Sequence, residues 1–462
     1  MTIIKSISGI RGTIGGKPDE NLTPIDAVKY AASFGTFLKK QSPNSVIKVV
    51  IGRDARISGN MIQNLVQSTL IGMGINCIDL GLSTTPTVEI AVKKELAQGG
   101  IVLTASHNPL NWNALKLLNK DGEFLNDSDG EKILSIAKKN DFIFSKVEEL
   151  GSVKSDSSYF DYHIQKVLDL QYTNNKAIKD SNFSVVVDGV NSTGGIIIPL
   201  ILEKLNVKYT LLYCDPNGQF PHNPEPLEEN LKELSKAVIS NKADMGIAVD
   251  PDVDRLAFID ENGEMFGEEY TLVACADYIL SKKKGNSVSN LSSTLALSKI
   301  TEKYGGEYFA SAVGEVNVVR LMKLKNAIIG GEGNGGVILP ELHYGRDAIV
   351  GIALFLSLLA EKKISVSELK KTYPQYYFSK NKITIDAKID VDKLLCQISK
   401  KYLDFNPLTI DGVKINFENS WVHLRKSNTE PIIRIYSEAV SKNIANKLSE
   451  KFIEELKSLI RG

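Results

Sequence analysis

The sequence predicts an α/β fold with three similar α/β domains followed by a smaller α+β domain. Two observations support this prediction. A chain of 462 residues is too long for one hydrophobic core and should divide into domains of about 100 to 150 residues. A pattern of strand, small-residue turn, helix and strand also recurs three times at wide intervals. This pattern is the α/β unit, and its wide spacing argues against a solenoid of short repeats.

Each of the three units begins with a short apolar strand that leads into a turn rich in glycine, serine or aspartate. A helical stretch follows the turn, and another short apolar strand follows the helix, as an α/β unit requires. The first unit has a strand at 46–51, a turn at 52–59 and a helix to about residue 73; the second has 183–187, 188–195 and about 205; the third has 287–291, 292–294 and about 304.

The last ninety or so residues change character and predict the smaller α+β domain. The boundary is placed at Tyr373-Pro374, because the residue before a proline disfavours helix. Short strands are predicted at 382–385, 412–417, 421–424 and 432–436, with helices at 391–402 and 442–460. The predicted domains are therefore 1–155, 156–258, 259–373 and 374–462.

Composition and charge exclude several classes of protein. The chain is 43% hydrophobic and 24% charged, with 55 basic and 55 acidic side chains, so no overall field favours nucleic acid or an anionic membrane. The four cysteines are far apart and predict buried free thiols in a reducing compartment. The N-terminus lacks a signal-peptide pattern and no apolar run reaches about 18 residues. We expect a cytoplasmic protein that binds neither nucleic acid nor membrane; the oligomeric state is left open.

Two short segments carry the strongest chemical signal. Residues 104–109 read Thr-Ala-Ser-His-Asn-Pro after the apolar run 100–103, and residues 250–255 read Asp-Pro-Asp-Val-Asp-Arg. Taken alone, the first could form an ordinary turn and the second a solvated acidic loop. Three carboxylates so close together repel one another unless a cation lies among them. The pair of segments indicates a nucleophile or phosphate carrier served by a hard divalent cation, and hence phosphoryl transfer.

Two similar motifs are excluded on physical grounds. Residues 250–261 match the acidic positions of a calcium helix-loop-helix loop, but Arg255 stands where glycine must make the sharp turn. Residues 331–336 match the spacing G-x-G-x-x-G, but Pro340 follows closely and argues against the helix that would bind a pyrophosphate. Calcium sensing and a dinucleotide fold are therefore not expected.

The chain resembles the α-D-phosphohexomutases over its whole length. Residues 52–59 and 215–226 also resemble segments of this family. The five segments that occur in the family's order and spacing are Ser-Gly-Ile-Arg-Gly at 8–12, Thr-Ala-Ser-His-Asn-Pro at 104–109, Asp-Pro-Asp-Val-Asp-Arg at 250–255, Gly-Glu-Gly-Asn-Gly-Gly at 331–336 and Arg-Lys-Ser-Asn-Thr-Glu-Pro at 425–431.

The resemblance implies that Ser106 carries a phosphoryl group. It also implies that Asp250, Asp252 and Asp254 bind Mg²⁺ together with the phosphoserine oxygen, a set of hard oxygen ligands that Mg²⁺ prefers. By the same resemblance, the cations near the transferring phosphate are Arg11, Lys116 and Arg255. Read alone, Arg11 could also be a surface arginine without a task. His107 is a candidate for general acid or base catalysis or for orienting the phosphoserine, although it could also be a structural histidine.

The resemblance further implies that Glu332 binds sugar hydroxyls. Asn334 takes the place of a usual serine and Gly336 that of a usual histidine, so hydroxyl recognition there departs from the common pattern. The loop with Arg425, Ser427, Asn428 and Thr429 matches the family's phosphate-binding loop, and its concentration of donors suits a dianion. Asn428 stands in for a common glycine, and asparagine tolerates a positive φ.

Within the family, the chain most resembles the phosphoglucosamine mutases. We therefore expect an isomerase that converts glucosamine 6-phosphate to glucosamine 1-phosphate, with a hexosamine 1,6-bisphosphate as intermediate and activator. The alternatives are a phosphomannomutase/phosphoglucomutase, a metal-dependent sugar phosphatase and a non-catalytic sugar-phosphate binding protein. The active site should lie in a central cleft to which all four domains contribute, and the last domain should be able to move.

Overall fold

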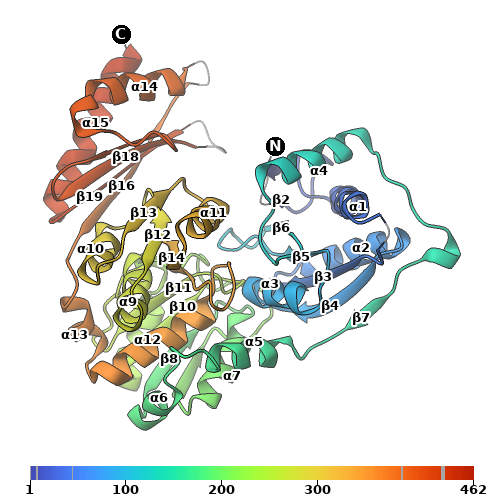
Figure 1. The fold of residues 1–462 in the computed structure, drawn as a ribbon, viewed down its shortest axis with the longest axis horizontal. Helices are drawn as coiled ribbons and strands as arrows, with labels where there is room; N and C mark the ends of the chain where they lie inside the picture. The colour runs from blue at the N-terminus through green and yellow to red at the C-terminus, as the bar shows by residue number, and fades with distance from the viewer. Residues whose placement is uncertain (1, 7–8, 44, 387–388, 428–431, 462) are drawn as a thin grey trace.

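The computed structural model describes residues 2–6, 9–43, 45–386, 389–427 and 432–461 (Figure 1). These residues form four sheets with accompanying helices. In Figure 1 the N-terminal domain (blue) lies on one side, the second and third domains on the other, and the C-terminal domain (red) beyond the third. The predicted fold class of three α/β domains followed by an α+β domain is confirmed.

The first domain has a mixed sheet of seven strands. Its strand order is β1 (Ile4–Ser6), β2 (Gly9–Thr13), β6 (Trp112–Leu118), β5 (Gly99–Leu103), β3 (Lys48–Arg53), β4 (Asn76–Leu82) and β7 (Val153–Ser155). Its helices are α1 (Pro24–Gln41), α2 (Gly59–Gly72), α3 (Thr85–Lys94) and α4 (Asp127–Lys139), with a short 3₁₀ turn η1 (Val147–Glu149).

The second and third domains each have a sheet of four strands. The second sheet is β11 (Leu256–Asp260), β10 (Met245–Val249), β8 (Ser184–Asp188) and β9 (Lys208–Leu212), with α5 (Tyr159–Leu168), α6 (Asn175–Ser181), α7 (Gly194–Lys204), η2 (Glu228–Asn230) and α8 (Lys232–Asn241). The third is β13 (Tyr308–Ser311), β12 (Asn286–Asn290), β14 (Ala327–Glu332) and β15 (Gly336–Ile338), with α9 (Glu268–Lys282), α10 (Leu295–Lys303), α11 (Glu315–Lys325), α12 (Ala348–Lys362) and α13 (Val366–Lys371).

One arrangement of four strands recurs in these three sheets. Three parallel strands lie side by side, and a fourth strand pairs antiparallel at one edge. The sets are β4, β3, β5 with β6; β9, β8, β10 with β11; and β13, β12, β14 with β15. The recurrence accounts for the threefold sequence pattern.

The C-terminal domain has an antiparallel sheet. The strand order is β16 (Tyr377–Thr384), β19 (Ile432–Ala439), β18 (Ser420–Lys426) and β17 (Val413–Asn416), with α14 (Val391–Lys401), η3 (Leu403–Phe405) and α15 (Lys442–Arg461). Strand β18 ends at Lys426 and β19 begins at Ile432, on either side of the segment predicted to bind phosphate.

The second and third domains share one hydrophobic core. Helix α12 is buried at every residue from 348 to 360 and packs against α9, α5 and α6. A helix that is apolar on all faces suits this central position. Phe258 of the second domain stacks on Phe355 of α12, with ring centroids 3.8 Å apart. The loops of these two domains are therefore carried by one continuous core.

The predicted domain boundaries stay a prediction. Strand β11 runs across the position between 258 and 259.

The cysteines are free, but only Cys77 and Cys275 are buried; Cys214 is half-buried and Cys396 is exposed. The prediction of four buried thiols was wrong for Cys396, because α14 packs with Leu395 and Ile398 and turns residue 396 outward. No helix within the described ranges is long and apolar enough to cross a membrane.

A buried cluster of ionisable side chains joins the first three domains. The Asp347 carboxylate lies 2.8 Å from Nε2 of His163 on α5 and 3.2 Å from Nε2 of His343. Nδ1 of His343 lies 3.2 Å from Glu89 of α3. Burial alone would lower the pKa of His343, but the two carboxylates raise it to about 10. His343 is therefore charged at neutral pH and links α3 to the start of α12.

Replacing His343 by glutamine is expected to destabilise the protein in a pH-dependent way. A histidine whose folded pKa is raised contributes its full stability below the unfolded pKa, and that contribution declines as pH rises toward the folded value. We expect a loss of about 3 kcal/mol at about pH 6 and a clearly smaller loss at about pH 9.5. Thermal unfolding at the two pH values measures this. The control is His423→Gln. Burial lowers the pKa of His423 to about 4, so its loss of stability should not become smaller at the higher pH. Equal losses for His343→Gln at both pH values would contradict the charged state.

Candidate active site

A cleft of about 650 Å³ lies between the four domains. Ser106 and His107 line it from the first domain, Arg255 from the second, Glu332 from the third and Arg434 from the fourth. The predicted central cleft with contributions from all four domains is therefore present.

Three of the predicted motifs occupy the same corner of the repeated sheet. The serine segment connects β5 to β6, the aspartate segment connects β10 to β11, and the glycine-rich segment connects β14 to β15. In each sheet this corner follows the parallel strand that pairs with the antiparallel fourth strand of the set. Ligands of open α/β sheets bind at the carboxyl ends of parallel strands. The repeated topology thus brings three segments that are far apart in sequence into one cleft.

Ser106 is held in a strained conformation at the base of the cleft. Its φ is +48°, and only 7% of the residue is exposed. Its backbone N–H donates to Oγ1 of Thr104 over 2.9 Å, and Thr104 donates to Asp54 over 2.6 Å. The Ser106 hydroxyl donates to Oδ2 of Asp250 over 2.6 Å. A left-handed conformation at a residue other than glycine costs energy and often marks a functional site.

Arg56 fixes the loop that carries Ser106. Its guanidinium is buried and donates to the carbonyl oxygens of Ser106, Asn108, Pro109 and Trp112, while Nε pairs with Asp54. The ring of Phe220 lies 5.0 Å from this guanidinium. The segments 52–59 and 215–226, which sequence comparison picked out without a role, therefore support the serine loop.

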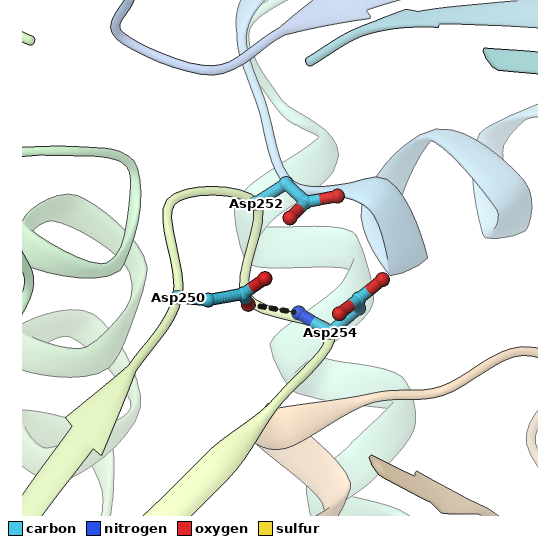
Figure 2. Close-up of side chains that lie close together, drawn as sticks. All are labelled: Asp250, Asp252 and Asp254. Carbon is cyan, nitrogen blue, oxygen red and sulfur yellow. Dashed lines mark hydrogen bonds between the residues drawn. The ribbon is translucent and has the colours of Figure 1, made fainter. Parts of the chain in front are cut away.

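The three aspartates form a compact, fully buried cluster. Figure 2 shows Asp250, Asp252 and Asp254 on one tight loop between two strands, and one carboxylate oxygen from each lies within 4.8 Å of the others. Oδ1 of Asp250 accepts the backbone N–H groups of Asp254 and Arg255, each over 3.1 Å. Burial raises the pKa of Asp250, and repulsion from Asp254 and Asp252 raises it further.

The cluster fits a hard divalent cation. Oδ1 of Asp252 and Oδ1 of Asp254 are buried and have no hydrogen-bond partner within the described part of the chain. Buried carboxylate oxygens are normally satisfied by donors or by a metal. Three carboxylates together with a serine oxygen make an all-oxygen ligand set, which is the set that Mg²⁺ prefers.

The predicted cations gather around this cluster. Lys116 on β6 lies 2.6 Å from Asp252 and 3.6 Å from Asp254. Burial alone would lower the pKa of Lys116, but these two carboxylates raise it. Arg11 lines the same cleft, and burial together with Arg255 lowers its pKa. Arg255 pairs with Glu225 over 2.7 Å.

His107 is a neutral imidazole beside the serine. Its Nδ1 lies 3.4 Å from Oγ of Ser106. Burial, and after it the charge of Arg255, lowers the pKa of His107 to about 2. In this state one ring nitrogen carries a proton and the other can accept a hydrogen bond, and so low a pKa makes the ring a weak base.

The glycine-rich segment forms a hairpin turn that carries Glu332 into the cleft. Oε1 of Glu332 accepts from Asn290 over 2.8 Å and from the backbone N–H of Gly314 over 3.0 Å. Asn334 lines the cleft, and its side-chain oxygen accepts the N–H of Gly336 over 3.2 Å. Strand β15 follows the turn, so the segment does not open a helix of the dinucleotide-binding kind.

The C-terminal domain adds residues to the cleft that were not predicted. Nε of Arg425 pairs with both carboxylate oxygens of Asp411 over 2.8 Å. Within the described ranges, Lys380, Arg434 and Tyr436 line the cleft, and Arg425 and Ser427 do not. Arg425 is nevertheless the cross-strand partner of Arg434. The predicted residues Asn428 and Thr429 lie outside the described residues.

Sequence reasoning missed two residues that contact the aspartate cluster. Arg346 pairs with Asp254 and Glu332, each over 2.7 Å. Thr85 donates to Asp252 over 2.5 Å. The only signal near Arg346 was Asp347, a polar residue before the apolar stretch of α12, where it caps the helix. Nothing local in the sequence marks Arg346 itself as a partner of the aspartates.

Comparisons with known proteins agree with this geometry. Models of the phosphoglucomutase/phosphomannomutase family match residues 3–144 (alpha/beta/alpha domain I), 158–263 (domain II), 267–377 (domain III) and 363–455 (C-terminal domain). A phosphoglucomutase/phosphomannomutase of Thermococcus kodakarensis is 36% identical, covering 98% of this chain and 99% of that protein. A phosphoglucosamine/phosphogalactosamine mutase of Sulfurisphaera tokodaii is 32% identical, covering 98% of each.

A solved structure shows the same fold. The family protein of Burkholderia thailandensis superposes with a TM-score of 0.84 at 24% identity, covering 99% of this chain and 98% of that one. The match of all four domain models, in order and over nearly the whole chain, confirms the expected resemblance. The chain belongs to the phosphoglucomutase/phosphomannomutase family, the α-D-phosphohexomutases.

Proposed function

We propose that this phosphohexomutase interconverts glucosamine 6-phosphate and glucosamine 1-phosphate through a phosphoserine at Ser106. The proposal rests on Ser106, which lines the four-domain cleft and whose hydroxyl lies 2.6 Å from Asp250 of the buried cluster of three carboxylates. A lone buried serine is a poor phosphate acceptor, so it needs neighbouring charge to act. The cluster and its cations supply that charge.

The transfer exchanges one phosphorus–oxygen bond for another. The bond between Oγ of Ser106 and phosphorus breaks while a bond forms between phosphorus and the free sugar hydroxyl, giving the 1,6-bisphosphate. The hydroxyl proton leaves to a base. Because the pKa of His107 is about 2, the neutral imidazole is a weak base and is better suited to orienting the serine. After the bisphosphate turns around, Oγ takes back the other phosphoryl group.

Asp250, Asp252 and Asp254 would hold Mg²⁺ together with an oxygen of the phosphoserine. Bound there, the ion polarises the phosphoryl oxygens and stabilises charge on the leaving oxygen. Lys116, placed 2.6 Å from Asp252, offsets the remaining negative charge near the transferring group. Arg11 and Arg255 line the same space and act as electrostatic clamps, on which phosphoryl transfer relies.

The phosphate that is not reacting would be held by the C-terminal domain through Arg425, Ser427, Asn428 and Thr429. Arg434 and Tyr436 line the cleft on the adjacent strand, and Arg434 faces Arg425 across the strand pair. Two guanidinium groups on one face of a sheet suit a phosphate dianion. In this arrangement Arg425 exchanges part of its contact with Asp411 for the phosphate.

Arg425→Ala is expected to raise KM for the sugar phosphate by about tenfold or more, because it removes a charge-assisted contact. A fall in kcat should accompany it if phosphate binding also closes the domain. The control is Lys426→Ala, since Lys426 is the next residue, is exposed and pairs only with exposed Asp392 among the described ion pairs. Unaltered kinetics for Arg425→Ala, or equal effects of both variants, would refute this role.

Glucosamine phosphate is favoured over hexose phosphates by the hydrogen-bond acceptors in the part of the cleft around Glu332. Glu315, Glu332 and the Asn334 carbonyl line this end, and carboxylate or carbonyl acceptors suit a 2-ammonium group. A probable phosphoglucosamine mutase of Pyrococcus horikoshii, 33% identical over 98% of both chains, supports the same substrate. The Thermococcus phosphoglucomutase/phosphomannomutase at 36% identity favours the alternative, a hexose phosphate.

The substrate is tested by comparing kcat/KM for the 1-phosphates of glucosamine, glucose and mannose under matched Mg²⁺ and bisphosphate. One charged hydrogen bond to the ammonium should favour glucosamine by roughly ten- to a hundredfold, with slow activity on glucose phosphate remaining. A higher kcat/KM for glucose or mannose 1-phosphate would replace the proposal with the phosphomannomutase/phosphoglucomutase alternative.

A further inference from the structure

Arg346, on the loop between β15 and α12, contacts carboxylates from three different segments. Nη2 lies 2.7 Å from Oδ2 of Asp254, Nη1 lies 2.7 Å from Oε2 of Glu332, and Nε lies 3.1 Å from Oε2 of Glu315. The residue is 8% exposed and lines the cleft. One guanidinium therefore connects the aspartate cluster of the second domain with the glycine-rich turn of the third.

These contacts determine which oxygens of Asp254 and Glu332 remain available to a ligand. Oδ2 of Asp254 is taken by Arg346, and Oδ1 is the oxygen with no donor in the described part of the chain. Oε1 of Glu332 already accepts two hydrogen bonds, from Asn290 and Gly314. A carboxylate oxygen has two acceptor positions. Oε2 of Glu332, shared with Arg346, is therefore the oxygen with a position left for a sugar group.

The stem of Arg346 also fills the space beside Gly336. A Cβ atom added to Gly336 would lie 2.3 Å from Cδ of Arg346 and 3.0 Å from Cγ. The φ of Gly336 is not in the positive region, unlike that of Gly335 at +86°. The backbone alone would thus accept a larger residue at 336. The closest atoms belong to the Arg346 stem, with Oδ1 of Asn334 next at 3.1 Å, so it is mainly Arg346 that requires glycine there.

We propose that Arg346 is a positioning residue of the sugar site, which holds Glu332 in place for the substrate and replaces a side chain at position 336. The inference rests on the proposed function, in which Glu332 binds the sugar. Lysine could not do the same, because one ammonium lacks the planar fork that reaches Asp254 and Glu332 in two directions. The role explains why a buried arginine and a glycine occur together at these two positions.

The kinetic test asks whether Arg346 acts through Glu332. Arg346→Lys should lower kcat/KM for the sugar phosphate by about tenfold or more, mainly through KM, since a displaced Glu332 weakens sugar binding. In a Glu332→Gln background, Arg346→Lys should change kcat/KM by no more than about twofold. The control is Arg320→Lys, an exposed arginine on α11, which should be neutral. If the double variant lost kcat/KM by the product of the two single losses, the two residues would act independently and the proposal would be overturned.

The thermal test concerns the shared space and needs no turnover. Gly336→Ala should lower Tm in the parent chain and much less in an Arg346→Ala background, because the clash partner is gone. Gly335→Ala is the matched control: its Cβ would lie 2.2 Å from the backbone oxygen of Leu256, so its cost should be the same in both backgrounds. Additive Tm losses for Gly336→Ala and Arg346→Ala would overturn the contact. If the parent chain turned over no sugar phosphate, the proposed function would be wrong. The Tm comparison would still show whether Arg346 occupies the space beside Gly336.

Discussion

Ser106→Ala is expected to lower mutase turnover by about a thousandfold or more, because the variant has no oxygen to carry the phosphoryl group between the two positions of the sugar. Oγ of Ser106 lies in the cleft and contacts Asp250, and the Arg56 guanidinium donates to the backbone carbonyl of Ser106. Initial rates on glucosamine 6-phosphate, with Mg²⁺ and a 1,6-bisphosphate activator, measure the loss.

A second serine in the same domain serves as control. Ser33 of α1 is buried and its hydroxyl donates to the carbonyl of Lys29. Ser33→Ala should leave turnover close to that of the parent chain, so a general effect of removing a buried hydroxyl is excluded. If Ser106→Ala kept full turnover, the phosphate carrier would have to be another residue.

Asp252→Asn is expected to lower kcat by about a hundredfold or more, since metal polarisation of the phosphoryl group supplies several kcal/mol. Asp252 keeps its Thr85 and Lys116 contacts on Oδ2 and leaves Oδ1 without a donor in the described structure. Asparagine retains the shape but supplies a neutral, weaker ligand. Direct Mg²⁺ or Mn²⁺ titration of the purified variant should show weaker binding as well as slower turnover.

The matched control is Asp260→Asn. Asp260 is also buried and ends β11, where it accepts the N–H groups of Asn262 and Glu264, and it does not belong to the three-aspartate cluster. It should cost stability and leave metal affinity unchanged. Full activity of chelator-treated parent protein without bound metal would contradict the assignment of the cluster.

The parts of the site that the sequence predicted are those that depend on local pattern. The buried strand β5 and the polar corner after it are visible as an apolar run followed by turn residues, so Ser106 could be placed at a strand end. The aspartates are close in sequence, and a single loop brings them together (Figure 2). Family resemblance then supplied their expected roles, which local chemistry alone left open.

The parts that the sequence did not predict depend on contacts between distant segments. Arg56 and Ser106 are fifty residues apart, and Arg346 and Asp254 ninety-two residues apart. The shared core of the second and third domains arises because α12 packs against α5 and α6, which no period in the sequence reveals. Arg425 was assigned to phosphate through the resemblance of its loop, and its pairing with Asp411 is visible only in the folded structure.

The location of the cleft follows from repetition of one topology. Each α/β unit places a polar corner after the same parallel strand, and the three corners meet with the last sheet around one space. The sequence indicated three units but not how they face one another. That relation comes from packing between domains, including the buried Asp347 cluster.

Intact mass with peptide mapping shows whether Ser106 carries the phosphoryl group. After incubation with a hexosamine 1,6-bisphosphate and Mg²⁺, the account predicts one added phosphoryl group, located on Ser106. This group should be lost, with formation of bisphosphate, when glucosamine 6-phosphate is then added. A phosphoryl group on a different residue, or sustained turnover by a chain that never becomes phosphorylated at Ser106, would contradict the account.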